Sequence, residues 1–258
     1  MTTMPSMFVG HGSPMLALDD NSITHTLTAL GQRILLHYGR PKAILMISAH
    51  WYKSRNLIQR TDFPEQIYDM YGFPKALYKV RYPVHGCAAL SDAVLGIKDL
   101  GAEVDNTWGI DHGTWTPLVH VFPKADIPVV QLSVNGVLQA RQCYEIGQLL
   151  APLRNQGYLI MGSGNVVHNL RRVNWDSRQG SPEAIAFNRY ITDAVERRDD
   201  TAVIGYACHP DARYAVPTAD HFLPLLYVLG SNNGRRVTTF NNHLELDAMA
   251  MTGYLIEE

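Results

Sequence analysis

Four histidines lie in four short, unusual sequence contexts that are far apart along the chain. They are His11 in Gly-His-Gly-Ser-Pro, His50 in Ser-Ala-His-Trp, His168 in Gly-Ser-Gly-Asn-Val-Val-His-Asn-Leu and His221 in Asp-His-Phe-Leu-Pro-Leu. Neutral imidazole is the commonest metal-ligating side chain in proteins. Several imidazoles brought to one place would form a metal centre, and this is the leading hypothesis from the residues alone.

The segments before these histidines indicate how they could meet. His11 and His50 each follow an apolar run directly, and a third run ends a few residues before His168. Continuous apolar runs of this kind are typical of parallel strands that are covered on both faces. Sites in open α/β sheets are built where such strands end. We therefore expect these histidines to share one edge of a sheet.

The hydrophobic pattern along the whole chain alternates between strand-like and helical segments. Strands are expected at 7–9, 43–48, 102–104, 128–132, 158–161, 202–205, 237–240 and 249–255, with an antiparallel pairing of the last two as one option. Helices are expected at 88–100, 114–121, 138–150, 182–195 and 220–229, and a first helix carries Ile23 to Ile34 and ends at Gly39. This alternation predicts an α/β fold with a central, mostly parallel sheet flanked by helices. No linker, repeat or charge block interrupts it, so residues 1–258 are expected to form a single domain.

Two segments stand apart from this alternation. Residues 61–86 are dense in proline, glycine and tyrosine, which predicts a long irregular excursion. Loops of this size are often lids or binding loops, and an ordinary surface insertion fits the composition equally well. The glycine-containing run at 162–165 lacks the ending of a phosphate-binding loop and the dinucleotide fingerprint. It is interpreted as a flexible turn that lets His168 face a pocket.

Composition narrows the class of protein. A formal net charge of -2 over 258 residues makes nucleic acid an improbable partner, and no apolar run reaches the roughly 20 residues of a membrane span. Cys87, Cys143 and Cys208 are odd in number and form no Cys-x-x-Cys pair, so we expect a protein of the reducing cytoplasm. Neither the nucleophile elbow of a serine hydrolase nor a His-Glu-x-x-His helix is present.

Six segments, in order from residue 10 to about residue 230, resemble the class III extradiol ring-cleavage dioxygenases. Within these enzymes the chain is most similar to the 4,5-DOPA extradiol dioxygenase branch, and the wider superfamily includes the β subunit of protocatechuate 4,5-dioxygenase. Besides the four histidine segments, the matching stretches are Tyr-Asp-Met-Tyr-Gly-Phe-Pro at 68–74 and Asp-His-Gly-Thr-Trp at 111–115. The resemblance implies a single α/β catalytic domain that opens a catechol ring with O2 at one metal ion, Fe(II) for turnover.

The resemblance also implies roles for individual residues. His11 and His50 match the metal-ligand positions of the family, and His221 matches the third. His168 matches the acid–base histidine and is placed closely enough to be a metal ligand as well. His112 matches a second catalytic histidine of the pocket.

Three further residues are assigned to substrate binding on the same basis. Tyr71 lies in the segment that covers the substrate in the family, and Ser13 and Trp51 stand beside two of the expected ligands. The substrate itself is left open among DOPA, caffeate and other para-substituted catechols. Monomer and homodimer are equally compatible with the sequence.

One departure from the usual oxygenase site keeps other functions open. Non-heme iron oxygenases commonly use two histidines and one carboxylate, whereas the third ligand here would be an imidazole unless Asp220 replaces it. A three-histidine site with an open position also suits Zn(II). The alternatives are therefore a zinc hydrolase that uses metal-bound hydroxide and a non-catalytic metal-binding interaction protein on the same fold.

Overall fold

Eight strands form one sheet in the computed structural model, which describes residues 3–258. They are β1 (Ser6–Gly10), β2 (Ala43–Lys53), β3 (Leu57–Ile58), β4 (Glu103–Val104), β5 (Val129–Asn135), β6 (Tyr158–Gly164), β7 (Arg236–Phe240) and β10 (Gly253–Glu257). Their order across the sheet is β4-β3-β5-β2-β6-β1-β10-β7. The central strands β5, β2, β6 and β1 pair in parallel, while β10 pairs antiparallel with both β1 and β7. A separate pair is formed by β8 (Leu244–Glu245) and β9 (Met249–Ala250).

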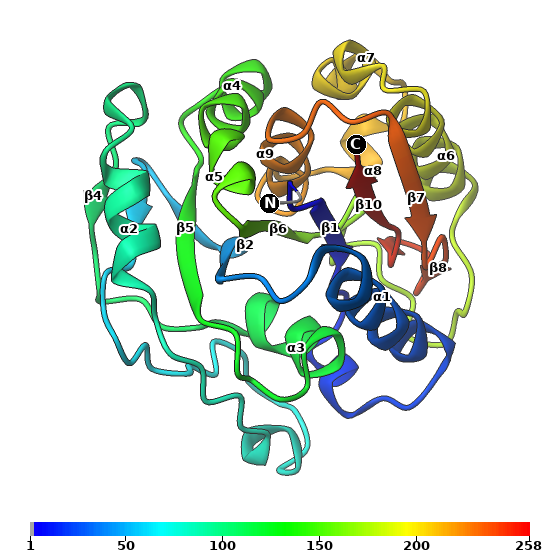
Figure 1. The fold of residues 1–258 in the computed structure, drawn as a ribbon. Helices are drawn as coiled ribbons and strands as arrows, with labels where there is room; N and C mark the ends of the chain where they lie inside the picture. Colours follow the sequence, from blue (N-terminus) through cyan, green and yellow to red (C-terminus); the bar gives the residue numbers. More distant parts are fainter. Residues whose placement is uncertain (1–2) are drawn as a thin grey trace.

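Helices cover both faces of this sheet (Figure 1). They are α1 (Ser22–Tyr38), α2 (Ala88–Leu95), α3 (His112–Val121), α4 (Ala140–Leu150), α5 (Pro152–Asn155), α6 (Pro182–Glu196), α7 (Asp200–Ile204), α8 (Ala212–Ala215) and α9 (Leu223–Gly230). Helices α1 and α3 pack on one face, and α4 and α9 pack on the other. The predicted α/β fold with a mostly parallel central sheet is confirmed.

Strand β2 shows why the sheet is covered twice. Successive side chains of a strand point to opposite faces. Leu45 and Ile47 enter the hydrophobic cluster that includes α4 and α9, and Ile44 and Met46 enter the cluster that includes α1 and α3. Because both sets are apolar, both faces must be buried, and the only polar positions left to the strand are near its carboxyl end.

Two strand predictions were wrong. Residues 202–205 do not form a strand, because Asp199 accepts a hydrogen bond from the backbone N–H of Ala202 at 3.1 Å and so caps helix α7. The expected strand at 249–255 is divided between β9 and β10. It breaks at Met251, whose N–H bonds to the His243 carbonyl outside the main sheet. The antiparallel relation of the two last expected strands is found between β7 and β10.

The glycine-rich run after residue 161 is also different from the prediction. Gly162, Ser163 and Gly164 belong to strand β6 and form no flexible turn. A Cβ atom at Gly164 would lie 2.1 Å from the carbonyl oxygen of His221. These glycines therefore serve close packing, since they let the segment before α9 approach β6, where the His221 carbonyl accepts a hydrogen bond from Asn165 at 2.9 Å.

Residues 61–86 form the long irregular excursion that the sequence predicts, with only a 3-10 turn at Leu77–Lys79 and one isolated bridge. Buried side chains hold it in place: Leu77 is fully buried, and the Tyr82 hydroxyl donates to the Phe122 carbonyl at 2.9 Å.

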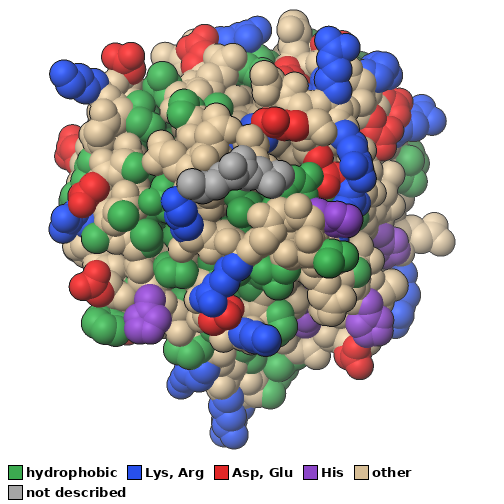
Figure 2. Space-filling model, viewed as in Figure 1, with side chains coloured by type: hydrophobic (Ala, Val, Ile, Leu, Met, Phe, Trp, Pro, Cys, Tyr) green, Lys and Arg blue, Asp and Glu red, His purple; other side chains and the backbone are tan. Residues whose placement is uncertain are grey.

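The surface carries basic, acidic and apolar side chains mixed together on the face seen in Figure 2. This mixture agrees with the formal net charge of -2. Within residues 3–258, no helix combines the length and the apolar character needed to cross a bilayer.

Candidate active site

Three of the sequence-predicted histidines converge at the carboxyl edge of the central strands. His11 directly follows β1, His50 lies near the end of β2, and His221 precedes α9 beside the end of β6. Their ring centroids are separated by 5.0 Å for His11 and His50, 5.2 Å for His11 and His221, and 5.1 Å for His50 and His221. The Nε2 atoms of His11 and His50 lie 3.1 Å apart.

The remaining two histidines of the prediction join this group. His112 is the first residue of α3, and its ring centroid is 3.8 Å from that of His50. His168 stacks on His221, with 3.5 Å between centroids and 6° between ring planes. One ligand atom from each of His11, His50 and His112 lies within 4.8 Å of the others, and the same holds for His168, Asp220 and His221. The five histidines therefore form one cluster, called here the histidine cluster.

Ser163 fixes the tautomer of His11. The Ser163 hydroxyl donates its own proton to the Gly113 carbonyl, so its oxygen accepts from Nδ1–H of His11 at 2.9 Å. The proton of the neutral ring is then on Nδ1, and Nε2 carries a free electron pair. Such partners commonly orient metal-binding imidazoles.

Asp220 does the same for His221. Its Oδ2 atom accepts a hydrogen bond from Nδ1–H of His221 at 2.5 Å, and the Nε2 atom of His221 is buried without any hydrogen-bond partner. Buried polar atoms are nearly always paired, because an unpaired one costs free energy. An unpaired imidazole nitrogen that belongs to a group of facing imidazoles fits a divalent metal ion, and the donor set suits iron or zinc.

Burial keeps the imidazoles in the form that binds metals. Burial is the main cause that lowers the pKa of His11 and of His50 well below the usual value, and neighbouring histidines lower it further. The same causes lower the pKa of His168 to about 3. For Asp220, burial would raise the pKa, but the hydrogen bond and charge of His221 outweigh it and lower the pKa below its usual range.

Asp69 is a site residue that the sequence interpretation missed. It belongs to the irregular excursion at 61–86, and its Oδ1 atom accepts from the backbone N–H of His112 at 2.9 Å. Its Oδ2 atom lies 3.0 Å from Nδ1 of His112 and 3.5 Å from Nδ1 of His50. The only available signal was its place in the 68–74 segment that resembles the family. Through Asp69, this excursion contacts two histidines of the cluster.

The Asp-His-Gly-Thr-Trp segment owes its residue types to the junction of α3 with β2. Asp111 caps α3 by accepting from the Thr114 N–H at 3.2 Å, and it also accepts from the Ser48 hydroxyl at 2.7 Å. A Cβ atom at Gly113 would lie 2.6 Å from the Ser48 hydroxyl oxygen and 2.8 Å from Cδ2 of His50. The glycine therefore lets His112 start its helix directly against the strand that carries His50.

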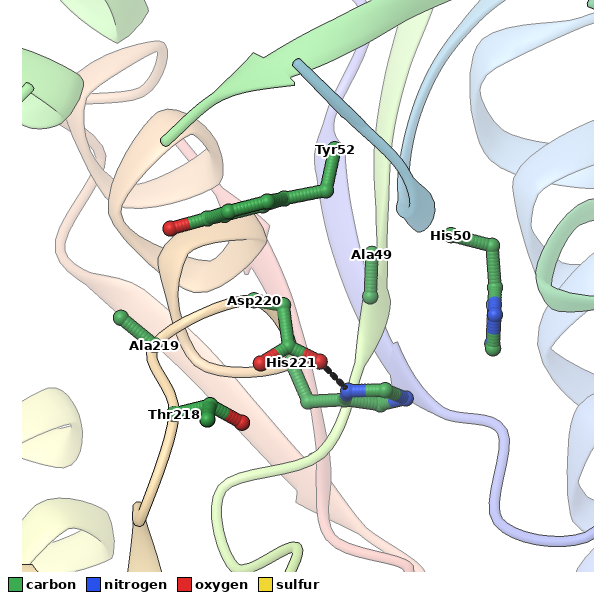
Figure 3. A pocket seen from close by; sticks show the side chains of 7 residues that line it. All are labelled: Ala49, His50, Tyr52, Thr218, Ala219, Asp220 and His221. Atoms are coloured by element: carbon green, nitrogen blue, oxygen red, sulfur yellow. Dashed lines mark hydrogen bonds and ion pairs between the residues drawn. The ribbon is translucent and has the colours of Figure 1, made fainter. Parts of the chain in front are cut away.

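A cavity of about 520 Å³ opens onto this cluster. Its walls come from the end of β2 and from the segment that leads into α9, and its lining residues are Ala49, His50, Tyr52, Thr218, Ala219, Asp220 and His221 (Figure 3). Two of the expected metal ligands therefore face a space in which a small molecule can bind.

The three residues assigned to substrate binding are not among those that line this cavity. The Ser13 hydroxyl accepts from the Met15 N–H at 3.3 Å and so caps a short 3-10 turn at Pro14–Leu18. Trp51 is fully buried, and Tyr71 is 92% exposed on the excursion. The structure brings the predicted histidines together, whereas it encloses Trp51 in the protein and leaves Tyr71 in solvent.

Comparison with known proteins decides the family. The model of the family described as the catalytic LigB subunit of aromatic ring-opening dioxygenase matches residues 5–255. The chain belongs to this family. A protein of Escherichia coli K12 named 4,5-DOPA dioxygenase extradiol is 37% identical over 97% of this chain and 93% of its own length. A protein of the same name from Beta vulgaris is 36% identical over 88% of this chain and 86% of its own length.

One solved structure has the same fold. The crystal structure of an uncharacterized protein from Escherichia coli K12 superposes with a TM-score of 0.85 at 34% identity, covering 98% of this chain and 100% of that one. The resemblance to extradiol dioxygenases and the prediction of an enzyme are thereby confirmed. This family member is an extradiol-type dioxygenase that acts on a small aromatic molecule and O2. Within its histidine cluster, ligand atoms of His11, His50 and His112 lie close enough together to hold a metal ion.

Proposed function

We propose that this LigB-family protein cleaves the ring of DOPA or a similar para-substituted catechol between carbons 4 and 5, with Fe(II) held by His11, His50 and His221. Two observations carry the metal assignment: the three ring centroids lie 5.0, 5.2 and 5.1 Å apart, and the buried Nε2 atom of His221 has no partner in the protein. His112 also lies close to His11 and His50, but its Nδ1 atom is 3.0 Å from the Asp69 carboxylate, so we assign the third position to His221. The names of the two relatives, 4,5-DOPA dioxygenase extradiol, support the substrate.

A metal ion held by these residues would supply charge that acidifies the catechol hydroxyls and a redox centre for the reaction of catechol with O2. The protein fixes the ligands for this purpose through Ser163 on His11, Asp69 beside His50 and Asp220 on His221. Because these three partners come from different elements, the ligand geometry depends on the folded chain and not on one local motif.

His168 is the residue that we assign to proton transfer. Burial lowers its pKa to about 3, so the ring is neutral near pH 7, and so weak a base would accept a catechol proton only where a bound metal acidifies the hydroxyl. Its stacking on His221 places it beside the expected metal, close enough to serve as a further ligand in the resting enzyme. His112, whose backbone N–H donates to Asp69, is the residue that we assign to returning a proton to the opened product.

The extent of the family match over residues 5–255 supports a single catalytic domain for the whole chain. Its substrate partners are then a catechol and O2. Zinc would fit the same imidazoles, so we expect that Zn(II) can occupy the site without supporting turnover.

The test is to remove bound metal and reload the protein anaerobically with Fe(II) or Zn(II). Oxygen uptake and colour are then recorded with L-DOPA, whose 4,5-cleavage product cyclises to a yellow compound. We expect uptake and yellow colour with iron alone. Absence of uptake with DOPA and with a panel of simple catechols would overturn the dioxygenase proposal. Hydrolytic activity of the zinc form without oxygen would favour the zinc hydrolase instead.

A further inference from the structure

We propose that the cavity selects catechols whose ring substituent carries a positive charge, and that Asp220 and Tyr52 recognise this charge. The inference rests on the proposed function, because it concerns the substrate of that same site. It narrows the substrate from any para-substituted catechol to those with an ammonium group. It assigns specificity to Tyr52, which has had no role so far, and to Asp220, which also orients His221.

The charge of the cavity wall is the first observation. Among the seven described residues that line the cavity, Asp220 is the one carboxylate, and none is lysine or arginine. The Asp220 side chain is 25% exposed, and the residue lines the cavity. Its hydrogen bond to His221 comes from an imidazole that is neutral when it binds a metal through Nε2, so the carboxylate keeps its negative charge. A second charged partner can therefore bind to it.

The fixed position of Tyr52 is the second observation. Its hydroxyl donates to the Gly136 carbonyl at 3.2 Å, and a Cβ atom at Gly136 would lie 2.1 Å from the Tyr52 ring. The ring therefore lies directly on the backbone of Gly136, which holds it as a wall of the cavity. In Figure 3 the Tyr52 ring lies above Asp220, and His50 lies to the right of both. The face of an aromatic ring attracts cations.

The nearest lysine along the chain does not cancel the negative charge of Asp220 in the cavity. Lys53 follows Tyr52 but does not line the cavity, and its Nζ atom lies 5.6 Å from the centroid of the Trp108 ring. The end of β2 therefore contributes an aromatic ring to the cavity and keeps its cation outside. An ammonium group on the substrate would gain both the carboxylate and the ring, whereas a carboxylate group would face Asp220 without a compensating cation.

A matched set of three catechols tests the inference on the Fe(II)-loaded protein. Dopamine carries a cationic side chain, 4-ethylcatechol a neutral one and 3,4-dihydroxyhydrocinnamate an anionic one. We expect kcat/KM to fall in that order, with about tenfold or more between the cation and the anion, since one charge-assisted hydrogen bond accounts for such a factor. Calorimetric binding of the same compounds to the Zn(II)-loaded protein should give the same order without turnover.

Variants assign the preference to residues. Asp220→Asn keeps an oxygen that can accept from His221 but removes the charge, so the dopamine-to-hydrocinnamate ratio should approach one. Tyr52→Leu should lower the ratio severalfold. Lys53→Gln changes one charge beside the cavity, and the ratio should stay as in the wild type. Each ratio compares substrates on the same preparation, so a general loss of metal or activity cancels.

The outcomes separate the two proposals. Equal rates with all three catechols, or a preference for the anion, would overturn the charge selection and leave the dioxygenase function standing. A ratio that survives Asp220→Asn would overturn the role of Asp220. No turnover of any catechol with iron would instead count against the proposed function.

Discussion

Two polar clusters with buried members lie at opposite ends of the central strands, and they differ in whether the buried polar atoms find hydrogen-bond partners within the cluster. The histidine cluster lies where β1 ends. The second, called here the Glu257 cluster, consists of Glu257, Arg33, Tyr38 and Arg236. It lies where β1 begins, because β10 pairs antiparallel with β1 and places Ile256 opposite Ser6.

In the Glu257 cluster, the buried carboxylate is paired by the other members of the cluster. The Glu257 side chain is 2% exposed, accepts from the Tyr38 hydroxyl at 2.8 Å, and pairs with the guanidinium groups of Arg33 and Arg236. The histidine cluster does not pair all of its polar atoms, since the Nε2 atom of His221 is buried without a hydrogen-bond partner. Burial alone does not distinguish a binding site from a structural network. Between these two clusters the difference is an unpaired nitrogen among neighbouring imidazoles, which leaves the histidine cluster able to bind a further group, whereas a lone unpaired hydroxyl such as that of Ser6 marks no site.

The largest effect is expected for removing the unpaired imidazole itself. In His221→Ala, the site loses one of its three proposed ligands, so metal affinity should fall by more than the roughly 10–100-fold that loss of an outer partner costs. Oxygen uptake with catechol should fall with it. Zinc titration calorimetry and an oxygen electrode measure the two quantities. A His221→Ala protein that binds zinc as tightly as the wild type would remove His221 from the ligand set.

A smaller effect is expected for His168→Ala. This variant should keep the metal and lose about 10²–10⁴-fold in kcat, which is the usual contribution of a general acid–base group. His25→Ala is a suitable control, because the His25 side chain is 71% exposed and bonds only to Asp20 among described side chains. Normal turnover by His168→Ala would contradict the proton-transfer role, and loss of metal would make His168 a ligand.

The next smaller effect is expected for Ser163, the hydrogen-bond partner of His11. Ser163→Ala removes the acceptor that holds Nδ1–H of His11, so metal affinity should fall about 10–100-fold. Ser6→Ala is a matched control, because the Ser6 hydroxyl oxygen is buried in the neighbouring strand β1 with no partner. If both variants bind zinc equally, the hydrogen bond of Ser163 does not orient the ligand.

The sequence did not predict which polar atoms of each cluster find hydrogen-bond partners. Strand-end positions predicted that His11 and His50 would share an edge, because apolar runs that precede them make buried parallel strands. No strand precedes His221, so only its sequence context and the family resemblance grouped it with the other histidines. Asp69 was missed because it lies in a segment without periodicity, and its partner His112 is 43 residues further along the chain.

The errors have the same origin in contacts between distant residues. Gly164 looks like a turn residue in its local sequence, and only the approach of the His221 backbone explains why a strand contains it. Residues 202–205 are too few to show a helical period, and the capping hydrogen bond of Asp199 decided in favour of a helix. Local sequence patterns therefore predicted the helices and strands of the layers. Contacts between distant residues decided the structure of the segments that follow the strand ends.

The smallest effect is expected in the Glu257 cluster and should appear in stability alone. Tyr38→Phe removes the hydroxyl that donates to Glu257, and burial with this neighbour already raises the pKa of Tyr38 to about 12. A hydrogen bond to a charged group contributes about 1.5–3 kcal/mol, and we expect about 1.5 kcal/mol because Tyr38 is only half-buried. Urea unfolding measures this loss, with Tyr71→Phe as a control whose side chain is 92% exposed.

Zinc affinity and kcat should stay unchanged in Tyr38→Phe, since Glu257 keeps both arginines and the cluster stays paired. A change in metal affinity would show that the two ends of the central strands are energetically coupled, and the distinction between a structural cluster and a binding cluster would then fail.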